Sequence, residues 1–124
     1  MFSCGEYQKV LNKGTSEDQY KMAVKMYEGK NYGKALRLFE KITPSYRDKP
    51  QMERIQFMVA QSNFNEKNYA TAAYYFDRFT NNYPNSSKKE EAAFLSAYTG
   101  NDPSTSNMSA FRNVPIPNWS LKYT

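Results

Sequence analysis

The sequence predicts an all-α fold, a solenoid of antiparallel helix pairs with about two and a half repeats. Three observations predict it. The chain resembles itself when shifted by 37 residues, and such a period is the signature of folds stacked from one small unit. Within each unit, apolar residues follow the spacing i, i+3, i+4 and i+7 of a helix face, in two runs that a short polar break separates. No segment shows the strict alternation expected of a strand.

The repeat is carried by seven positions that keep their residue or residue class under the 37-residue shift. The matching pairs are Ala23 and Ala60, Tyr27 and Phe64, Lys30 and Lys67, Asn31 and Asn68, Tyr32 and Tyr69, Ala35 and Ala72, and Phe39 and Phe76. A third, partial copy follows, in which Phe94 and Ala97 correspond to Phe57 and Ala60. Each copy therefore predicts two helices joined by a tight turn.

In the first unit, Ser16 to Gln19 matches a capping box, with acidic residues in the first turn, where the helix dipole favours them. The apolar stripe of this helix consists of Tyr20, Ala23, Val24 and Tyr27. Lys30 and Asn31 break the helix, and we expect Asn31 to adopt the left-handed conformation that the turn requires. The second helix carries the stripe Tyr32, Ala35, Leu36, Phe39 and Ile42. We expect Pro44 to end the unit.

The second unit begins near Pro50, a residue favoured in a first helical turn. Its stripes consist of Phe57, Ala60, Gln61 and Phe64, and then of Tyr69, Ala72, Ala73, Phe76 and Phe79. Asn81 to Pro84 stop the second helix, and a capping box at Ser87 to Glu90 opens a fifth helix that runs to about Tyr98. We expect a leading linker segment 1–14, a repeat domain 15–100 with units at 16–48, 50–85 and 87–100, and an irregular tail 101–124.

Alanine and phenylalanine have distinct roles in this prediction. Ala23 and Ala35 are expected where the two helices of the first unit approach most closely, and Ala60 and Ala72 at the same place in the second. Phe39 and Phe76 are expected to fill the space between the helices.

Composition excludes several classes of function. The 124-residue chain has no histidine and one cysteine, which removes histidine-dependent nucleophiles, histidine-ligated metals and internal disulfides. The formal charge of +5 is scattered rather than gathered into the basic stripe that a nucleic-acid binder needs. No apolar run approaches the roughly 20 residues that span a bilayer. We therefore expect no catalysis, no cofactor or metal, and no nucleic-acid partner.

The pattern of alanine, a turn, then Tyr-x-x-Ala-x-x-x-Phe resembles the tetratricopeptide repeat, most clearly in residues 28–42 and 66–79. A narrower resemblance is to BamD-type outer-membrane assembly lipoproteins of Bacteroidetes-like bacteria. It covers roughly residues 2 to 100 and is carried by Cys4 to Leu11, by the stretch YYFDRFTNNYPNS at residues 74–86 and by Glu90 to Tyr98.

This resemblance implies a non-catalytic scaffold in the machinery that folds and inserts β-barrel proteins into the outer membrane. Cys4 would be acylated and would anchor the protein at the periplasmic face. The partners would be the central barrel-assembly subunit and unfolded outer-membrane proteins. The alternative from the residues alone is a soluble cytoplasmic repeat adaptor in which Cys4 is incidental.

BamD-like proteins contain more repeats than this sequence supplies, and only three residues precede Cys4. We therefore interpret the chain as truncated. The fifth helix would then expose an apolar face, formed by Ala93, Phe94, Leu95 and Ala97. Either the tail folds back over it, or two chains pair there as a homodimer. The tail residues available for this are Phe111, Val114, Ile116, Trp119 and Leu121.

Repeat geometry also predicts which residues line a concave groove that binds an extended peptide, because first helices face inward. The candidates are Tyr20, Val24, Tyr27, Arg54, Phe57, Gln61, Phe64, Phe94 and Tyr98. For Tyr27 and Phe64, packing between repeats is the favoured alternative, and for Arg54 a solvated charge. From the sequence we expect that truncating Tyr20 and Phe57 together weakens peptide binding and leaves helicity intact.

Overall fold

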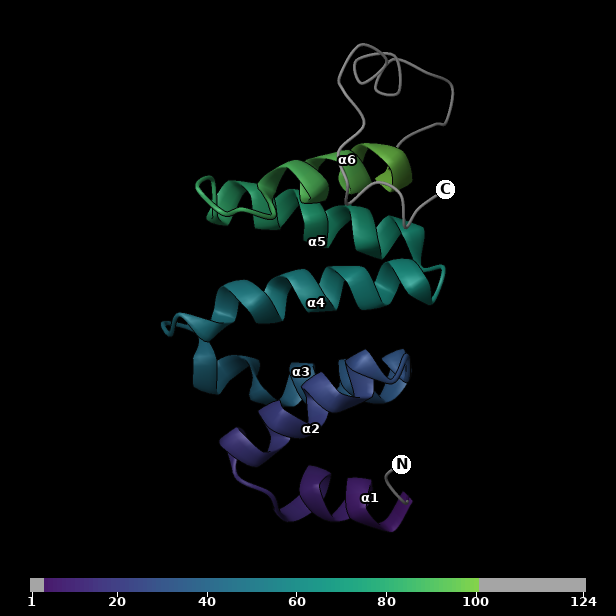
Figure 1. Ribbon diagram of the computed structural model, residues 1–124, viewed down its shortest axis with the longest axis vertical. Helices are drawn as coiled ribbons and strands as arrows, with labels where there is room; N and C mark the ends of the chain where they lie inside the picture. Colours follow the sequence, from purple (N-terminus) through teal and green to yellow (C-terminus); the bar gives the residue numbers. More distant parts are fainter. Residues whose placement is uncertain (1–3, 101–124) are drawn as a thin grey trace.

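The structure is a computed structural model that describes residues 4–100. These residues form six helices and contain no strand, which confirms the all-helical prediction. The helices are α1 (Cys4–Lys13), α2 (Ser16–Glu28), α3 (Tyr32–Tyr46), α4 (Gln51–Asn65), α5 (Tyr69–Asn82) and α6 (Lys89–Gly100). They stack along the long axis of the molecule, and each runs back across the one before it (Figure 1).

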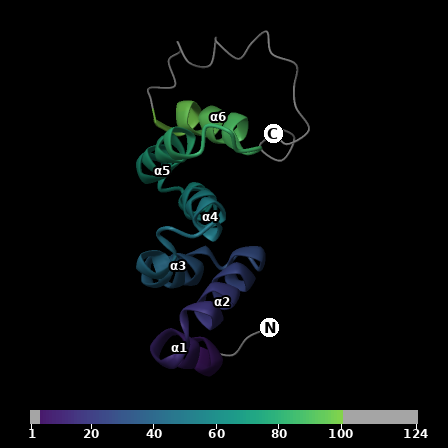
Figure 2. The ribbon, with the colours of Figure 1, turned by 90° about the vertical axis from the view of Figure 1, so that its left-hand side faces the viewer.

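The helices form two layers. Helix α2 packs against α3, α4 against α5, and α6 against α5, while α3 and α4 join the two units. Viewed from the side, α2, α4 and α6 lie on one side of the stack and α3 and α5 on the other (Figure 2). We call the side formed by α2, α4 and α6 the first-helix face. The first helices of successive units thus share one surface, as the solenoid prediction requires.

Close helix packing depends on the four repeat alanines. Ala23, Ala35, Ala60 and Ala72 are all completely buried. The first two belong to the hydrophobic core of the α2–α3 unit and the last two to the core around α4, α5 and α6. Phe39 and Phe76 are also completely buried, one in each core. Their predicted roles at the helix contacts are therefore supported by burial at both equivalent positions.

The turns inside the two helix pairs are alike, but the left-handed residue is lysine and not asparagine. Lys30 has φ 63° and Lys67 has φ 65°. At the first turn the Asn31 N–H donates to the Met26 carbonyl at 2.7 Å. This bond belongs to a Schellman motif, which places the left-handed residue one position before the asparagine. The expectation for Asn31 was wrong, because the motif fixes its register on the preceding helix.

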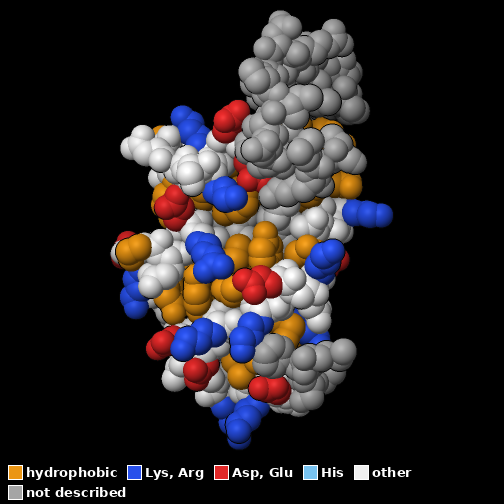
Figure 3. All heavy atoms as spheres, viewed as in Figure 1, with side chains coloured by type: hydrophobic (Ala, Val, Ile, Leu, Met, Phe, Trp, Pro, Cys, Tyr) orange, Lys and Arg blue, Asp and Glu red, His pale blue; other side chains and the backbone are white. Residues whose placement is uncertain are grey.

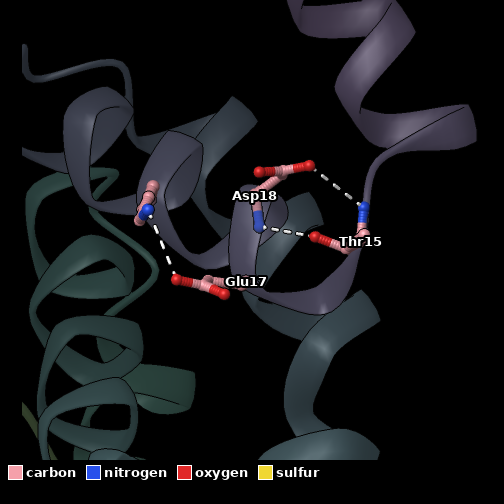
Figure 4. A network of polar contacts seen from close by, with 4 residues as sticks. Thr15, Glu17 and Asp18 are labelled. Atoms are coloured by element: carbon pink, nitrogen blue, oxygen red, sulfur yellow. Dashed lines mark hydrogen bonds and ion pairs between the residues drawn. The ribbon is translucent and has the colours of Figure 1, made fainter.

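The capping box of α2 is also displaced by one residue. Thr15, not Ser16, is the N-cap of α2: its Oγ1 accepts from the Asp18 N–H at 3.1 Å, and the Asp18 carboxylate accepts from the Thr15 N–H (Figure 4). Before α6, the Ser86 hydroxyl accepts from the Lys88 N–H at 3.0 Å, a bond within the loop that precedes the helix start at Lys89. The predicted capping box of α2 is therefore present one residue earlier than expected, while the one expected at Ser87 to Glu90 stays a prediction.

Helix α1 was not anticipated. Its Tyr7 and Leu11 are buried against the α2–α3 core. The carbonyls at its C-terminal end are bound by side chains from later helices: the Gln19 amide donates to Leu11 O at 3.1 Å, and the Lys41 ammonium donates to the same oxygen. Gly14 follows so closely that a Cβ there would lie 2.6 Å from the Val10 carbonyl oxygen. Residues 4–13 are therefore docked on the repeats.

Two further expectations need correction. Helix α3 continues through Pro44 and ends at Tyr46, since proline near the last turn costs one hydrogen bond without preventing helical φ. On α6, Leu95 is completely buried against α5, so the apolar face expected there does not include it. Ala93, Phe94 and Ala97 are half-buried. The tail residues expected to cover this helix lie outside the described residues.

Candidate polypeptide-binding face

The nine predicted groove residues all belong to helices of the first-helix face. Three lie on α2, four on α4 and two on α6. Viewed from the side shown in Figure 1, hydrophobic side chains gather around α4, with Lys, Arg, Asp and Glu side chains beside them (Figure 3). The structure divides the nine residues into a hollow, an aromatic cluster and a group of packing residues.

The hollow is an open pocket of about 360 Å³ between the C-terminal end of α2, the first half of α4 and the loop before α6. Phe57, Met58 and Phe79 give it an apolar floor. Its charged lining comes from Glu28, Glu53, Arg54 and Lys88, so both signs are present. Tyr27 completes the wall on the α2 side. The hollow can therefore accept an apolar group while offering donors and acceptors around it.

Tyr27 is half-buried at the edge of this hollow. Burial raises the pKa of the Tyr27 hydroxyl to about 12, with smaller contributions from Tyr32 and Glu91, while Arg54 opposes the rise. The three groups Tyr27, Arg54 and Glu91 come from α2, α4 and α6. The hydroxyl therefore keeps its proton to a higher pH than a solvent-exposed tyrosine does.

Lys88 ties the loop before α6 to the same place. Its ammonium lies 3.5 Å from the carboxylate of Glu91, a residue only 1% exposed. The same ammonium lies 5.4 Å from the centre of the Phe57 ring. Both contacts hold the lysine beside the apolar floor, where it contributes a cation to the rim.

The aromatic cluster consists of Phe64, Tyr69, Phe94 and Tyr98 and lies at the other end of α4. The Phe64 ring is 5.7 Å from Tyr69 and 6.4 Å from Tyr98, and Phe94 stacks on Tyr98 at 6.2 Å with an interplanar angle of 15°. Tyr98 is 50% exposed. The cluster therefore presents an accessible aromatic surface, and its rings pack against one another.

Phe57, besides forming part of the floor of the hollow, serves packing, as do the three predicted residues not yet placed. Phe57 is 8% exposed and contacts Phe76 and Phe79 edge to face, and Gln61 is 6% exposed. Tyr20 and Val24 are half-buried against the first core, and the Tyr20 ring lies 5.4 Å from Tyr46. Truncating Tyr20 and Phe57 together would consequently remove core contacts, so the expectation of unchanged helicity does not fit this packing.

Sequence reasoning missed Tyr69, Lys88, Glu28 and Glu53. The repeat itself contained a signal for Tyr69, because the Tyr27–Tyr32 contact of the first unit, at 5.8 Å, recurs in the second as Phe64–Tyr69. Lys88 lies in a loop that the apolar periodicity does not cover. Charged residues at helix ends give no apolar spacing, so only the folded arrangement brings them together.

A larger hollow, of about 530 Å³, lies on the opposite side of α4, between α3 and α5. Met52, Ile55 and Val59 are part of its lining, with Tyr75 and Arg78 from α5. None of the nine predicted residues lines it. It is a surface separate from the first-helix face.

Within residues 4–100, no helix has the length and apolar character to cross a membrane. The same part of the chain contains no group of three or more cysteine or acidic residues placed to hold a metal ion.

The stacked helix pairs, with their repeat alanines at the contacts and a continuous first-helix face, define a helical repeat scaffold of the tetratricopeptide type. The profile of the YfiO family, described as outer membrane lipoprotein, matches residues 12–117. The chain belongs to this BamD-like family of non-catalytic lipoprotein scaffolds. Membership indicates a role in outer-membrane assembly. Searches of curated proteins and of solved structures gave no significant match.

Proposed function

We propose that this protein is a lipid-anchored scaffold at the periplasmic face of the outer membrane that helps to fold and insert β-barrel proteins. It performs no chemistry. It binds polypeptide on the first-helix face, and its partners are the central barrel-assembly subunit and unfolded outer-membrane proteins. Family membership supports the role in outer-membrane assembly, and the geometry of the first-helix face supports the binding of polypeptide there.

The observation that carries the proposal is the pairing of an open hollow with an exposed aromatic cluster on one face. Rigid aromatic anchors give contact area at low entropic cost, and such residues dominate the energetics of peptide interfaces. Tyr98 is half exposed, and the hollow offers an apolar floor with polar groups around it. A polypeptide laid along this face would bury side chains and still satisfy its backbone groups.

The membrane link is assigned to Cys4. Each buried methylene of an acyl chain contributes about 0.8 kcal/mol, so one chain holds a protein marginally and several hold it stably. We expect mass spectrometry of the native N-terminus to show acylation of Cys4. We expect Cys4→Ser to move the protein from the membrane fraction to the soluble fraction. An unmodified thiol on native protein would favour the soluble adaptor instead.

Binding is tested by fluorescence anisotropy with a labelled, urea-unfolded outer-membrane barrel protein diluted into the purified chain. Tyr98→Ala and Arg54→Gln are expected to weaken binding by roughly five- to tenfold each, since each removes an accessible group from the face. The matched controls are Tyr74→Ala and Arg37→Gln, on α5 and α3, where both side chains are exposed. Circular dichroism and light scattering confirm that the variants keep the wild-type fold and oligomeric state.

Two results would contradict the proposal. In the first, the wild-type chain does not bind the unfolded protein at micromolar concentrations. In the second, the control variants weaken binding as much as the Tyr98 and Arg54 variants, which would move the contact surface away from the first-helix face.

A further inference from the structure

We infer that one end of the molecule, formed by the outer side of α1 and the adjoining face of α3, binds a surface of anionic phospholipid headgroups. Five cations make this contact, and we call them the basic end: Lys9, Lys13, Lys34, Arg37 and Lys41. The inference goes beyond the proposed function, because it adds an electrostatic membrane contact that needs no acyl chain and involves no polypeptide.

The excess positive charge of the described chain lies in its first half. Residues 4–50 contain ten basic and six acidic side chains, whereas residues 51–100 contain five of each. In Figure 3, Lys and Arg side chains lie at the end of the molecule that α1 forms. The basic residues are spread along the sequence, and folding brings five of them to this one end.

Three of the five cations share the face of α3 that borders α1. Lys34, Arg37 and Lys41 have the spacing i, i+3 and i+7 of one helix face. The Lys34 ammonium lies 5.1 Å from the centre of the Tyr7 ring. The Lys41 ammonium, two turns further along α3, donates to the Leu11 carbonyl. These two contacts fix the face beside α1, and the exposed Arg37 lies between them.

The other two cations lie on the outer side of α1. Tyr7 and Leu11 are buried in the core, and Lys9 is about 200° around the helix from Tyr7. Lys13 follows one turn after Lys9, and both lysines are exposed. Helix α1 is the last of the stack at this end, and no other described helix lies beyond it (Figure 1). The two lysines are therefore open to a flat surface.

Acidic side chains do not cancel this charge. Glu40 of α3 lines the hollow between α3 and α5, away from α1. At the start of α2, the Glu17 carboxylate pairs with the Lys21 ammonium at 3.3 Å, and the Asp18 carboxylate accepts from the backbone of its own cap. Glu6 is the acidic residue of α1. With Glu6 counted, the basic end keeps a net charge of +4.

The shape of the basic end favours a lipid surface over a small ligand. None of its five cations lines either of the two hollows, and a small ligand needs a concave site. Long flexible cationic side chains can instead follow headgroups that move laterally. Each Lys or Arg near an anionic bilayer strengthens binding about fivefold.

The position of Cys4 supports the same partner, and this step rests on the proposed acylation of that residue. Cys4 begins α1, so Lys9 lies about 8 Å and Lys13 about 14 Å from it along the helix axis. The screening length at physiological salt is about 8 Å. An acylated Cys4 would therefore bring the nearer lysine into the range in which it attracts the headgroups.

The test measures co-sedimentation of the full chain carrying Cys4→Ser, so that no acyl chain contributes. The vesicles contain phosphatidylethanolamine and phosphatidylglycerol at about 3:1, or phosphatidylcholine alone. At about 50 mM salt we expect binding to the anionic vesicles, and we expect neutral vesicles or about 500 mM salt to abolish it. Lys9→Gln, Lys13→Gln and Arg37→Gln together should lower the affinity on the order of a hundredfold. Lys34 and Lys41 stay unchanged because they contact α1.

The matched control removes the same charge from the balanced half of the chain, at exposed positions. It combines Lys67→Gln, Arg78→Gln and Lys89→Gln, and it should bind the anionic vesicles like the parent chain. Lys9→Arg with Lys13→Arg keeps the charge and should also retain binding. Circular dichroism confirms that all variants keep their helices.

Equal losses in the two triple variants would show that net charge alone is responsible and would overturn the inference. Failure of the parent chain to bind anionic vesicles would overturn it as well. The proposed function would then stand or fall separately, on the unfolded barrel protein and on the mass of the native N-terminus. Tighter binding to a labelled DNA duplex of about 20 base pairs than to the vesicles would assign the basic end to nucleic acid instead.

Discussion

The two left-handed lysines provide a direct test of how the helix pairs are built. Lys30 and Lys67 occupy equivalent turns, with φ of 63° and 65°, and both side chains are exposed. A residue with a Cβ in this region costs roughly 1–2 kcal/mol. Glycine avoids this clash. It also raises the conformational entropy of the unfolded chain, which reduces the gain in stability by about 0.5–1 kcal/mol. We therefore expect Lys30→Gly and Lys67→Gly each to stabilise the protein by about 0.5–1 kcal/mol.

The two turns lie in separate helix pairs, so the effects of the substitutions should add. The double variant is expected to gain about 1–2 kcal/mol, and a domain of this size shifts its midpoint by about 4–8 °C per kcal/mol. Urea and thermal unfolding followed by circular dichroism at 222 nm measure both quantities. The urea m-value should stay unchanged, because neither substitution alters the surface that unfolding exposes.

Lys30→Ala separates the backbone effect from charge. Alanine removes the ammonium but keeps the Cβ, so we expect no gain from it. An equal gain from alanine and glycine would show that relief of positive charge is the cause. A loss of stability with glycine would show that the turn is not in the left-handed region, and the Schellman interpretation would be wrong.

Three further substitutions test other parts of the fold by urea unfolding. Ala35→Leu should destabilise the protein by about 1–3 kcal/mol through overpacking of the α2–α3 contact. Ala70→Leu, at an exposed position, should leave stability nearly unchanged. Equal losses of stability in the two variants would mean that the α2–α3 contact can expand to take the larger side chain. Thr15→Ala should cost about 1 kcal/mol of stability by removing the cap of α2, whereas Thr15→Ser should retain most of that stability. Equal stability of the alanine and serine variants would show that the hydroxyl does not contribute. The raised pKa of Tyr27, about 12 against an ordinary 10.0, means that the unfolded chain loses this proton first. Stability is therefore full below pH 10 and falls by about 2–3 kcal/mol as the pH rises to 12. Tyr27→Phe should remove this loss of stability between pH 10 and 12. A variant that loses as much stability as the wild type over this pH range would contradict the raised pKa of Tyr27.

The repeat period predicted the helices and the alanine contacts because both depend on side-chain spacing along one helix. It identified Tyr27, Arg54, Phe64 and Tyr98 as neighbours of one face for the same reason. It could not distinguish Phe57 from these residues, since its burial depends on how α5 packs beneath α4. Loop residues such as Lys88 were missed because they have no periodic signal.

The short first helix was missed for a different physical reason. An isolated helix of ten residues is marginal in water. Helix α1 is held by contacts that no local pattern reveals: the Gln19 amide and the Lys41 ammonium bind its terminal carbonyls, and Tyr7 enters the core. Such long-range contacts determine the structure of residues 4–13 more than their own propensity does.

The docking of α1 has a mechanical consequence for an acylated Cys4. The helix begins at that residue, so no slack linker separates the acyl chains from the stacked repeats. A protein on a long flexible linker samples many orientations above a bilayer. This one would rotate about its attachment point, with its first helix close to the lipid headgroups. The angle between α1 and the membrane surface would then determine the orientation of the whole stack. It would also determine the direction in which the first-helix face points.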